Sequence, residues 1–277
     1  MIGRHRPVGR LRRLGWVYAA KFRNEIALQF AYRGALVIWL LGLLLEPIVY
    51  LVVWRTVAAG QGGSVGGFDG GDFAAYFTLL MIVNQLTFTW HFWEFDWRVR
   101  NGFFSPMLLR PVHPIHNDVA ENLTFKLLTF AVVAPVALVL IVAFGATFRS
   151  EPWHVLAFVP ALVLAMALRF VLEWTLALVA FWTTRTSAIN HAWYLVVLFL
   201  SGQAAPLALL PAVIQAAANV LPFRWMVSFP VVVALGRVGP ADVLLGYAAQ
   251  ALWIGIALVA LRIGWRAGIR RYSAVGA

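Results

Sequence analysis

Long apolar stretches, separated by short polar or glycine-rich segments, run along nearly the whole of this 277-residue chain. Hydrophobic residues make up 62% of the sequence and charged residues only 12%, whereas soluble domains carry about 25% charged residues. About 20 consecutive apolar residues cross the hydrocarbon core of a bilayer as one helix. The sequence therefore predicts an all-α polytopic membrane protein.

Six apolar stretches predict six transmembrane helices, at 34–57, 73–97, 119–144, 153–182, a region starting near 189, and 241–263. Pro135 lies near the middle of the third span and predicts a kink there. The fifth span is interrupted by Pro206 and Pro211. We therefore expect short helices between 201 and 239 that partly re-enter the membrane or lie on its extracellular side.

The segment before the first span has its own periodicity. Apolar residues recur every three or four positions from Leu11 to Phe30, and lysines and arginines fill the other faces. This pattern predicts an amphipathic helix in the membrane interface, with its cations among anionic headgroups. A helix packed in a cytoplasmic bundle is the alternative. The basic region is too long for a secretory signal peptide, so we expect 1–33 to form a cytoplasmic tail plus this interfacial helix.

Lysines and arginines are unevenly divided between the two sets of span ends. Sixteen lie before 34, between 98 and 110, at Arg185 and after 261, whereas the opposite ends carry four: Arg55, Arg149, Arg224 and Arg237. The positive-inside rule then places both termini and the segment 98–117 in the cytoplasm. Topology also explains the net charge of +11, so a nucleic-acid partner is not expected.

The segment 98–117 is the one long polar break that is neither glycine-rich nor a basic tail. Ser105 and Pro106 form a helix-start signal, and Pro111 stops the apolar run that follows. This predicts a cytoplasmic helix of one to two turns that displays Phe103, Phe104, Leu108 and Leu109. A loop that only joins two spans needs no such helix, so we interpret it as a docking surface for a cytoplasmic partner.

Ionisable residues inside spans are candidates for function because burying them is costly. Glu46 lies in the first span directly before Pro47, either facing a substrate path or hydrogen-bonded to a neighbouring span. Arg169 and Glu173 are one helical turn apart in the fourth span. We interpret them as an intramembrane ion pair that locks the packing of the spans, with a role in transport as the alternative.

Other chemistry has little support in the sequence. The chain has no cysteine, and His113 and His116 lack the spacing of a metal site, so no metal is expected. His91, Glu94 and Asp96 are interpreted as part of an interface belt paired with Arg98 and Arg100. No nucleophile motif, ion-filter loop or GxxxxGK[ST] phosphate-binding pattern is present, which argues against an enzyme, a channel or an ATPase.

This arrangement resembles the permeases of type-2 ABC exporters. Within that class, RNGFFSPMLLRPVHP resembles the loop in which a glycine is followed, after a few residues, by Leu-Leu-Arg-Pro. FLSGQAAPLALLP, followed by LPF, resembles the segment after the fifth span. The resemblance covers nearly the whole chain, and these two motifs are its specific part. It implies one permease domain over 1–277, with a six-span bundle at 34–265 and a cytoplasmic tail at 266–277.

The resemblance also implies partners. Such permeases work as dimers, each subunit bound to a cytoplasmic ABC ATPase that carries ATP and magnesium, so this chain would be non-catalytic and would bind no cofactor. A heterodimer with a second permease is favoured, and a homodimer is the alternative. The segment 102–111 would be a coupling helix seated in a groove of the ATPase. The residues assigned to this contact are Arg98, Arg100, Gly102, Phe103, Phe104, Leu108, Leu109, Arg110 and Pro111, with the arginines meeting acidic groups.

By the same resemblance, spans one, two and five would line the substrate pathway. Its candidate lining residues are Glu46, Trp39, Phe88 and Trp90. An apolar pathway with few charges suits an amphiphile better than an ion or a sugar. We therefore expect export of a drug, antibiotic or lipid across the bacterial plasma membrane. The alternative is a membrane scaffold that binds a cytoplasmic partner without transport.

Overall fold

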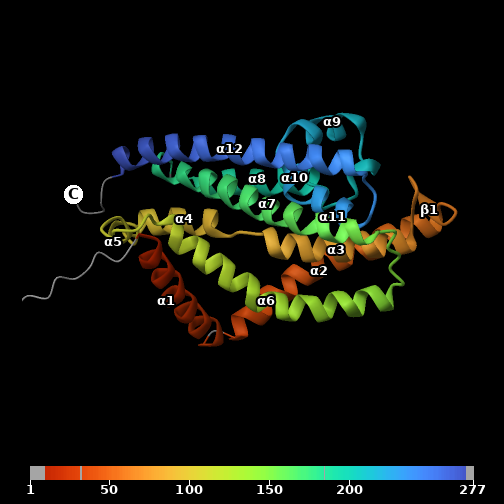
Figure 1. The fold of residues 1–277 in the computed structure, drawn as a ribbon, viewed down its shortest axis with the longest axis horizontal. Helices are drawn as coiled ribbons and strands as arrows, with labels where there is room; N and C mark the ends of the chain where they lie inside the picture. Colours follow the sequence, from red (N-terminus) through yellow and green to blue (C-terminus); the bar gives the residue numbers. More distant parts are fainter. Residues whose placement is uncertain (1–9, 32, 184, 273–277) are drawn as a thin grey trace, which may run out of the picture.

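The structure is a computed structural model that describes residues 10–31, 33–183 and 185–272. Most of its helices run along one common direction, with a small hairpin at one end and α5 at the other (Figure 1). The elements are α1 Arg10–Ala31, α2 Arg33–Gly60, β1 Ser64–Val65, β2 Phe68–Asp69, α3 Gly70–Thr87, α4 His91–Arg100, α5 Ser105–Leu108, α6 Ile115–Ala143, α7 Pro152–Ala177, η1 Leu178–Phe181, α8 Thr186–Leu200, η2 Leu207–Leu209, α9 Ala212–Val220, α10 Phe223–Met226, α11 Ser228–Ala234 and α12 Pro240–Arg271.

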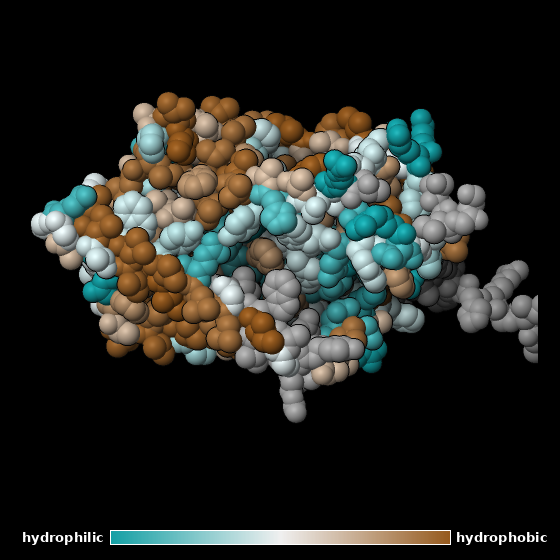
Figure 2. All heavy atoms as spheres, turned by 180° about the vertical axis from the view of Figure 1, so that it is seen from behind, coloured by the Kyte–Doolittle hydropathy of each residue, from teal (hydrophilic) through white to brown (hydrophobic). Residues whose placement is uncertain are grey.

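The structure is almost entirely helical, as expected for an all-α polytopic membrane protein, whereas the count of six spans stays a prediction. Among the described residues, Gly70–Arg100, Ile115–Ala143, Pro152–Phe181 and Pro240–Arg271 are long and apolar enough to cross a membrane. The most apolar window of the first is 67% buried, against 28%, 28% and 22% for the other three. The first therefore lies inside the bundle, and the others turn apolar surface outward. Figure 2 shows broad apolar surface on the left and hydrophilic side chains gathered towards the right, the end where α5 lies.

The core is built around α3. Phe73, Tyr76 and Phe77 on this helix are all at most 1% exposed. The ring of Trp54 on α2 stacks on Phe73 at 5.6 Å between centroids, and the Tyr76 hydroxyl donates to the carbonyl of Gly202 at 2.7 Å. Gly202 has φ +85°, and a Cβ there would lie 2.8 Å from the Tyr76 oxygen. The segment after α8 is thus tied directly to the central helix.

The predicted second span is interrupted. Between α3 and α4 the backbone of Phe88 is extended (φ −54°, ψ 142°), so the chain leaves helical geometry at 88–90. The hydroxyl of Thr89 donates to Glu173 at 2.7 Å, and Arg169 donates to the hydroxyl of Thr87 at 3.1 Å. These polar partners on α7 stabilise the break. The predicted span over 73–97 thus lies within Gly70–Arg100, which is long and apolar enough to cross a membrane, but two helices form it instead of one.

The end of the bundle opposite α5 carries a cluster of charged residues. Asp69 and Asp72 cap α3 reciprocally, the Asp69 side chain accepting from the Asp72 N–H at 2.8 Å. Asp72 also lies 3.4 Å from Arg149 and 2.8 Å from Arg237. Two of the four arginines assigned to the less basic side therefore meet at one end of the molecule, at the far end from α5 (Figure 1).

The segment 201–239 consists of short helices, as predicted. Val227, Val231 and Val233 are fully buried there, and the backbone carbonyl of Trp225 accepts from Gln250 on α12 at 2.9 Å. Protein thus covers this irregular backbone. Partial re-entry into the membrane stays a prediction.

Two further predictions concern the outer helices. The helix before the first span is present as α1, and α6 contains Pro135 and changes direction along its length (Figure 1). The segment assigned to the cytoplasmic tail, from 266, is helical as far as Arg271 because α12 continues to that residue, and its place in the cytoplasm stays a prediction. Trp265, Ile269 and Tyr272 pack against a cluster of buried aromatic residues, and this packing keeps the basic segment helical.

Candidate functional site

The loop between α4 and α6 is a compact, structured turn. Gly102 has φ +75°, a backbone conformation that favours glycine, and it reverses the chain after α4. The N–H of Phe104 donates to the carbonyl of Arg98 at 3.0 Å and closes the turn. α5 then begins at Ser105 with Pro106 in its first turn, which confirms the predicted short helix.

Phe104 fastens this loop to the rest of the protein. Its side chain is 1% exposed and lies 5.0 Å from Phe95, 5.6 Å from Phe181 and 5.7 Å from Tyr272, between ring centroids. The hydroxyl of Ser105 also bonds to that of Tyr272 at 2.7 Å. The prediction that Phe104 is displayed is therefore wrong. Its ring fills an aromatic cluster built by α4, η1 and the end of α12, and so holds α5 in place.

The outward side of the loop is apolar. Leu109 is 89% exposed and Phe103 is 56% exposed, and the Phe103 ring stacks on Trp97 at 4.7 Å. Leu108, predicted to be displayed, is only half-exposed because it packs on the buried aromatic cluster. We call the exposed set, Trp97, Phe103, Leu109, Arg110 and Pro111, the docking surface.

Two of the three arginines assigned to the partner are already paired within the chain. Arg98 is 12% exposed and donates to Asp118 and to Glu94, both at 2.7 Å. Arg100 makes two bonds to Asp96, at 2.9 and 2.6 Å, but stays half exposed. Arg98 is thus not available to acidic groups of a partner, contrary to the prediction, because α6 brings Asp118 to it. Arg110 remains exposed.

A groove of about 390 Å³ separates this loop from α1. Val17, Lys21 and Asn24 line it on the α1 side, and Arg110 and His113 line it on the loop side. The hydroxyl of Tyr18 bonds to Nδ1 of His116 at 3.0 Å beside it. α1 and the loop therefore form the two walls of one groove.

The surroundings of His113 disfavour its protonated form. Its ring lies 4.2 Å from that of Trp265 between centroids, and its Nδ1 accepts the N–H of Ile115 at 3.2 Å. Burial, and then the neighbouring His116, lower the pKa of His113 below its ordinary value. The unfolded chain, with a histidine pKa of about 6.5, therefore binds more protons than the folded protein as the pH falls below about 6.5.

We expect the melting temperature of the detergent-solubilised protein to fall as the pH is lowered from 7.5 to 5.5. His113→Gln, which keeps an acceptor but cannot take up a proton, should make this fall shallower. Differential scanning fluorimetry at matched ionic strength measures both proteins. Identical pH profiles would contradict the assignment.

A second polar region lies midway along the bundle. Glu46 on α2 accepts a hydrogen bond from the hydroxyl of Tyr194 on α8 at 3.0 Å. Both line a cavity of about 80 Å³, together with Phe88, Arg169 and Glu173. Glu46 thus has both features expected from its two interpretations, a bond to a neighbouring helix and a place in a cavity wall.

The predicted ion pair in α7 is present. The Nε of Arg169 lies 2.9 Å from Glu173, and the side chains are only 6% and 1% exposed. Arg169 also donates to the amide oxygen of Asn84 at 2.7 Å, and its guanidinium lies over the ring of Phe88 at 5.6 Å. The pair therefore belongs to a network that joins α7 to the break between α3 and α4.

The other three residues predicted to line the pathway are Trp90, Trp39 and Phe88. Trp90 stacks on His91 at 4.7 Å and packs on Phe125 of α6, so its ring is engaged away from the cavity of Glu46. The side chain of Trp39 lies outside the described residues. Phe88 shares the cavity with Glu46.

Sequence reasoning missed Tyr194, Asn84 and Asp118. Tyr194 carries no distinguishing signal among the aromatic residues of its span. Asn84 is a polar residue inside an apolar run, and Asp118 precedes Glu121 by one helical turn at the start of the third span. Both patterns could have marked them as buried polar groups that need partners.

Comparison with known families gives one match. The sequence model of a family described as "ABC-2 family transporter protein" matches residues 44–276, which is most of the chain. No curated protein and no solved structure matches the chain.

Proposed function

The chain belongs to the ABC-2 family of transporter proteins, and we propose that it is the permease subunit of an ATP-driven exporter of amphiphilic or lipid-like substrates. ABC-2 permeases generally work with an ATPase partner. The observation that carries the proposal is the docking surface: Leu109 and Phe103 are exposed on a turn whose neighbour Phe104 is locked into the core. A rigid apolar surface of this kind can transmit a movement of the partner to the helices.

The proposed assembly follows from this surface. The docking surface, which includes Arg110, would sit in a groove of a separate ABC ATPase that binds ATP and magnesium. A second permease, or a second copy of this chain, would complete the pathway. Six spans, formed by α2, α3–α4, α6, α7, α8 with the segment after it, and α12, would place both termini in the cytoplasm of a bacterium.

The substrate class is inferred from the cavity beside Glu46. Phe88, Trp193 and Val197 supply apolar surface there, and the neighbouring Arg169 and Glu173 already neutralise each other. Glu46 is thus the carboxylate of this wall that lacks a cationic partner among the described residues. A cationic amphiphile would match both the apolar surface of this wall and the carboxylate of Glu46.

We expect Glu46→Gln to change the range of substrates more than the yield of folded protein. Stimulation of ATP hydrolysis by cationic amphiphiles should weaken roughly tenfold, as expected for loss of a charge-assisted contact, and stimulation by neutral ones should change little. The matched control is Tyr194→Phe, which removes the hydrogen bond and keeps the carboxylate. Loss of folded protein in Glu46→Gln would show that the carboxylate is structural.

Purification of the full-length protein from its native membrane, followed by an assay of the eluate for ATP hydrolysis, tests the proposed function. We expect an ATPase to co-purify, and its activity to be stimulated by amphiphiles. A scaffold would bind the same partner through the same surface. Co-purification without any stimulation by substrate would favour the scaffold, and elution of the chain alone would overturn the proposal.

A further inference from the structure

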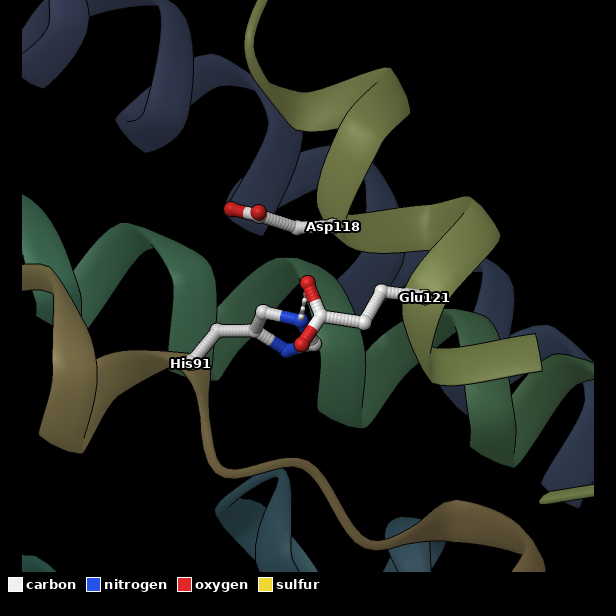
Figure 3. Close-up of side chains that lie close together, drawn as sticks. All are labelled: His91, Asp118 and Glu121. Atoms are coloured by element: carbon white, nitrogen blue, oxygen red, sulfur yellow. Dashed lines mark ion pairs between the residues drawn. The ribbon is translucent and has the colours of Figure 1, made fainter. Parts of the chain in front are cut away.

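His91, the first residue of α4, is buried without a hydrogen bond. It is 1% exposed, and neither ring nitrogen has a hydrogen-bond partner among the described residues. Leaving such a polar group unpaired in the interior is unfavourable. Its Nε2 lies 4.0 Å from Oε2 of Glu121, too far for a hydrogen bond. Figure 3 shows the imidazole pointing towards the carboxylates of α6.

Two carboxylates meet this imidazole from one face of α6. Asp118 and Glu121 are three residues apart, so both side chains project towards α4. One potential ligand atom from each of the three residues lies within 4.8 Å of the others. One imidazole and two carboxylates therefore converge on a single small volume, contributed by two helices.

The charge around this volume is unbalanced. Asp118 is 1% exposed and Glu121 is 21% exposed, and the guanidinium of Arg98 is 2.7 Å from the first and 3.7 Å from the second. Glu121 accepts no hydrogen bond from any described residue, whereas Asp118 accepts from Arg98 and from the indole N–H of Trp174 at 2.9 Å. Arg98 thus faces Asp118 and Glu121 while also bonding to Glu94, and Lys126 is a second buried cation near His91. Three carboxylates against these two cations leave room for further positive charge here.

We propose that His91, Asp118 and Glu121 bind a divalent transition-metal ion of the zinc type. An imidazole ligand selects such ions over magnesium and calcium. Ligands about 2.0–2.1 Å from a tetrahedral ion lie about 3.4 Å apart, so the 4.0 Å between His91 and Glu121 closes by a small side-chain movement. Each carboxylate oxygen has two acceptor positions, so Asp118 can keep its bonds to Arg98 and Trp174.

The place of the site suggests what the ion does. α4 enters the loop that carries the docking surface, and α6 leaves it. An ion held by both helices would fix the loop at its two ends. This consequence rests on the proposed function, whereas the binding of the ion itself does not.

The experiment uses the full-length protein in detergent, stripped with a chelator and then titrated with Zn²⁺. We expect about one ion per chain by equilibrium dialysis with elemental analysis. His91→Gln and Glu121→Gln should each weaken binding at least about tenfold. The matched control is His191→Gln, which changes a histidine on α8 outside this cluster and should bind Zn²⁺ like the unaltered protein.

A second readout separates loss of the site from loss of the fold. Zn²⁺ should raise the melting temperature of the unaltered protein and of His191→Gln, but not of Glu121→Gln, which keeps the shape of a partly exposed side chain. Absence of binding to the unaltered protein, or binding unchanged in both His91→Gln and Glu121→Gln, would overturn the proposal. A melting temperature of the unaltered protein that changes with pH through His91, but does not change when Zn²⁺ is added, would overturn the proposal as well.

Discussion

Leu109→Asp should abolish co-purification of the ATPase and substrate-stimulated ATP hydrolysis while leaving membrane insertion and melting temperature unchanged. The side chain is 89% exposed, so the folded chain loses almost no packing when it is replaced. A carboxylate pressed into an apolar groove of a partner must lose its hydration without gaining a counterion. A central interface residue of this kind contributes about 2 kcal/mol or more, which corresponds to at least roughly 30-fold weaker binding.

The control for this prediction is Val213→Asp. Val213 is 80% exposed and lies on α9, far from α5 along the molecule (Figure 1). The substitution introduces the same charge at a similarly exposed aliphatic position, and we expect normal recovery of the ATPase. Unchanged co-purification in Leu109→Asp would refute the docking role of the loop, and equal loss in both variants would point to a general effect of the charge.

Much of this fold follows from local patterns in the sequence. The apolar runs predict the long helices because a bilayer allows little else. The short helix α5 was predictable because Ser105-Pro106 and Pro111 act on residues next to them in the chain. The ion pair in α7 was predictable for the same reason, since its members are one turn apart on one helix.

The errors lie where partners come from distant parts of the chain. The break within the span over 73–97 has no local signal, because the groups that stabilise it, Arg169 and Glu173, lie far along the sequence. Phe104 and Leu109 are both apolar residues of one loop, and only the position of α12 buries the first and leaves the second exposed.

The candidate metal cluster shows the same limit. His91 lies 27 positions before Asp118 in the sequence, in a stretch that reads as an aromatic interface belt. Nothing local links it to α6. The histidines that do stand close together, His113 and His116, make contacts with Trp265 and Tyr18 instead.

Arg169→Leu should lower the free energy of unfolding by about 3–5 kcal/mol, because it leaves Glu173 charged and buried without its cation. The hydroxyl of Thr89 and the indole of Trp193 would remain near the carboxylate, at 2.7 and 3.4 Å, but neither carries charge. The substitution also removes the donors to Asn84 and Thr87 at the break between α3 and α4. We therefore expect a lower melting temperature and a lower yield from detergent extracts.

The double variant Arg169→Met with Glu173→Leu distinguishes a structural role of the pair from a role in transport. Replacing both buried charges by apolar side chains of similar size removes the unpaired charge, and such exchanges are often neutral or stabilising. If the pair only locks the packing of α7 against α3, the double variant should recover most of the lost stability and should transport substrate. Recovered folding without recovered substrate-stimulated ATP hydrolysis would instead place the pair in the transport cycle, in the wall of the cavity that Glu46 shares.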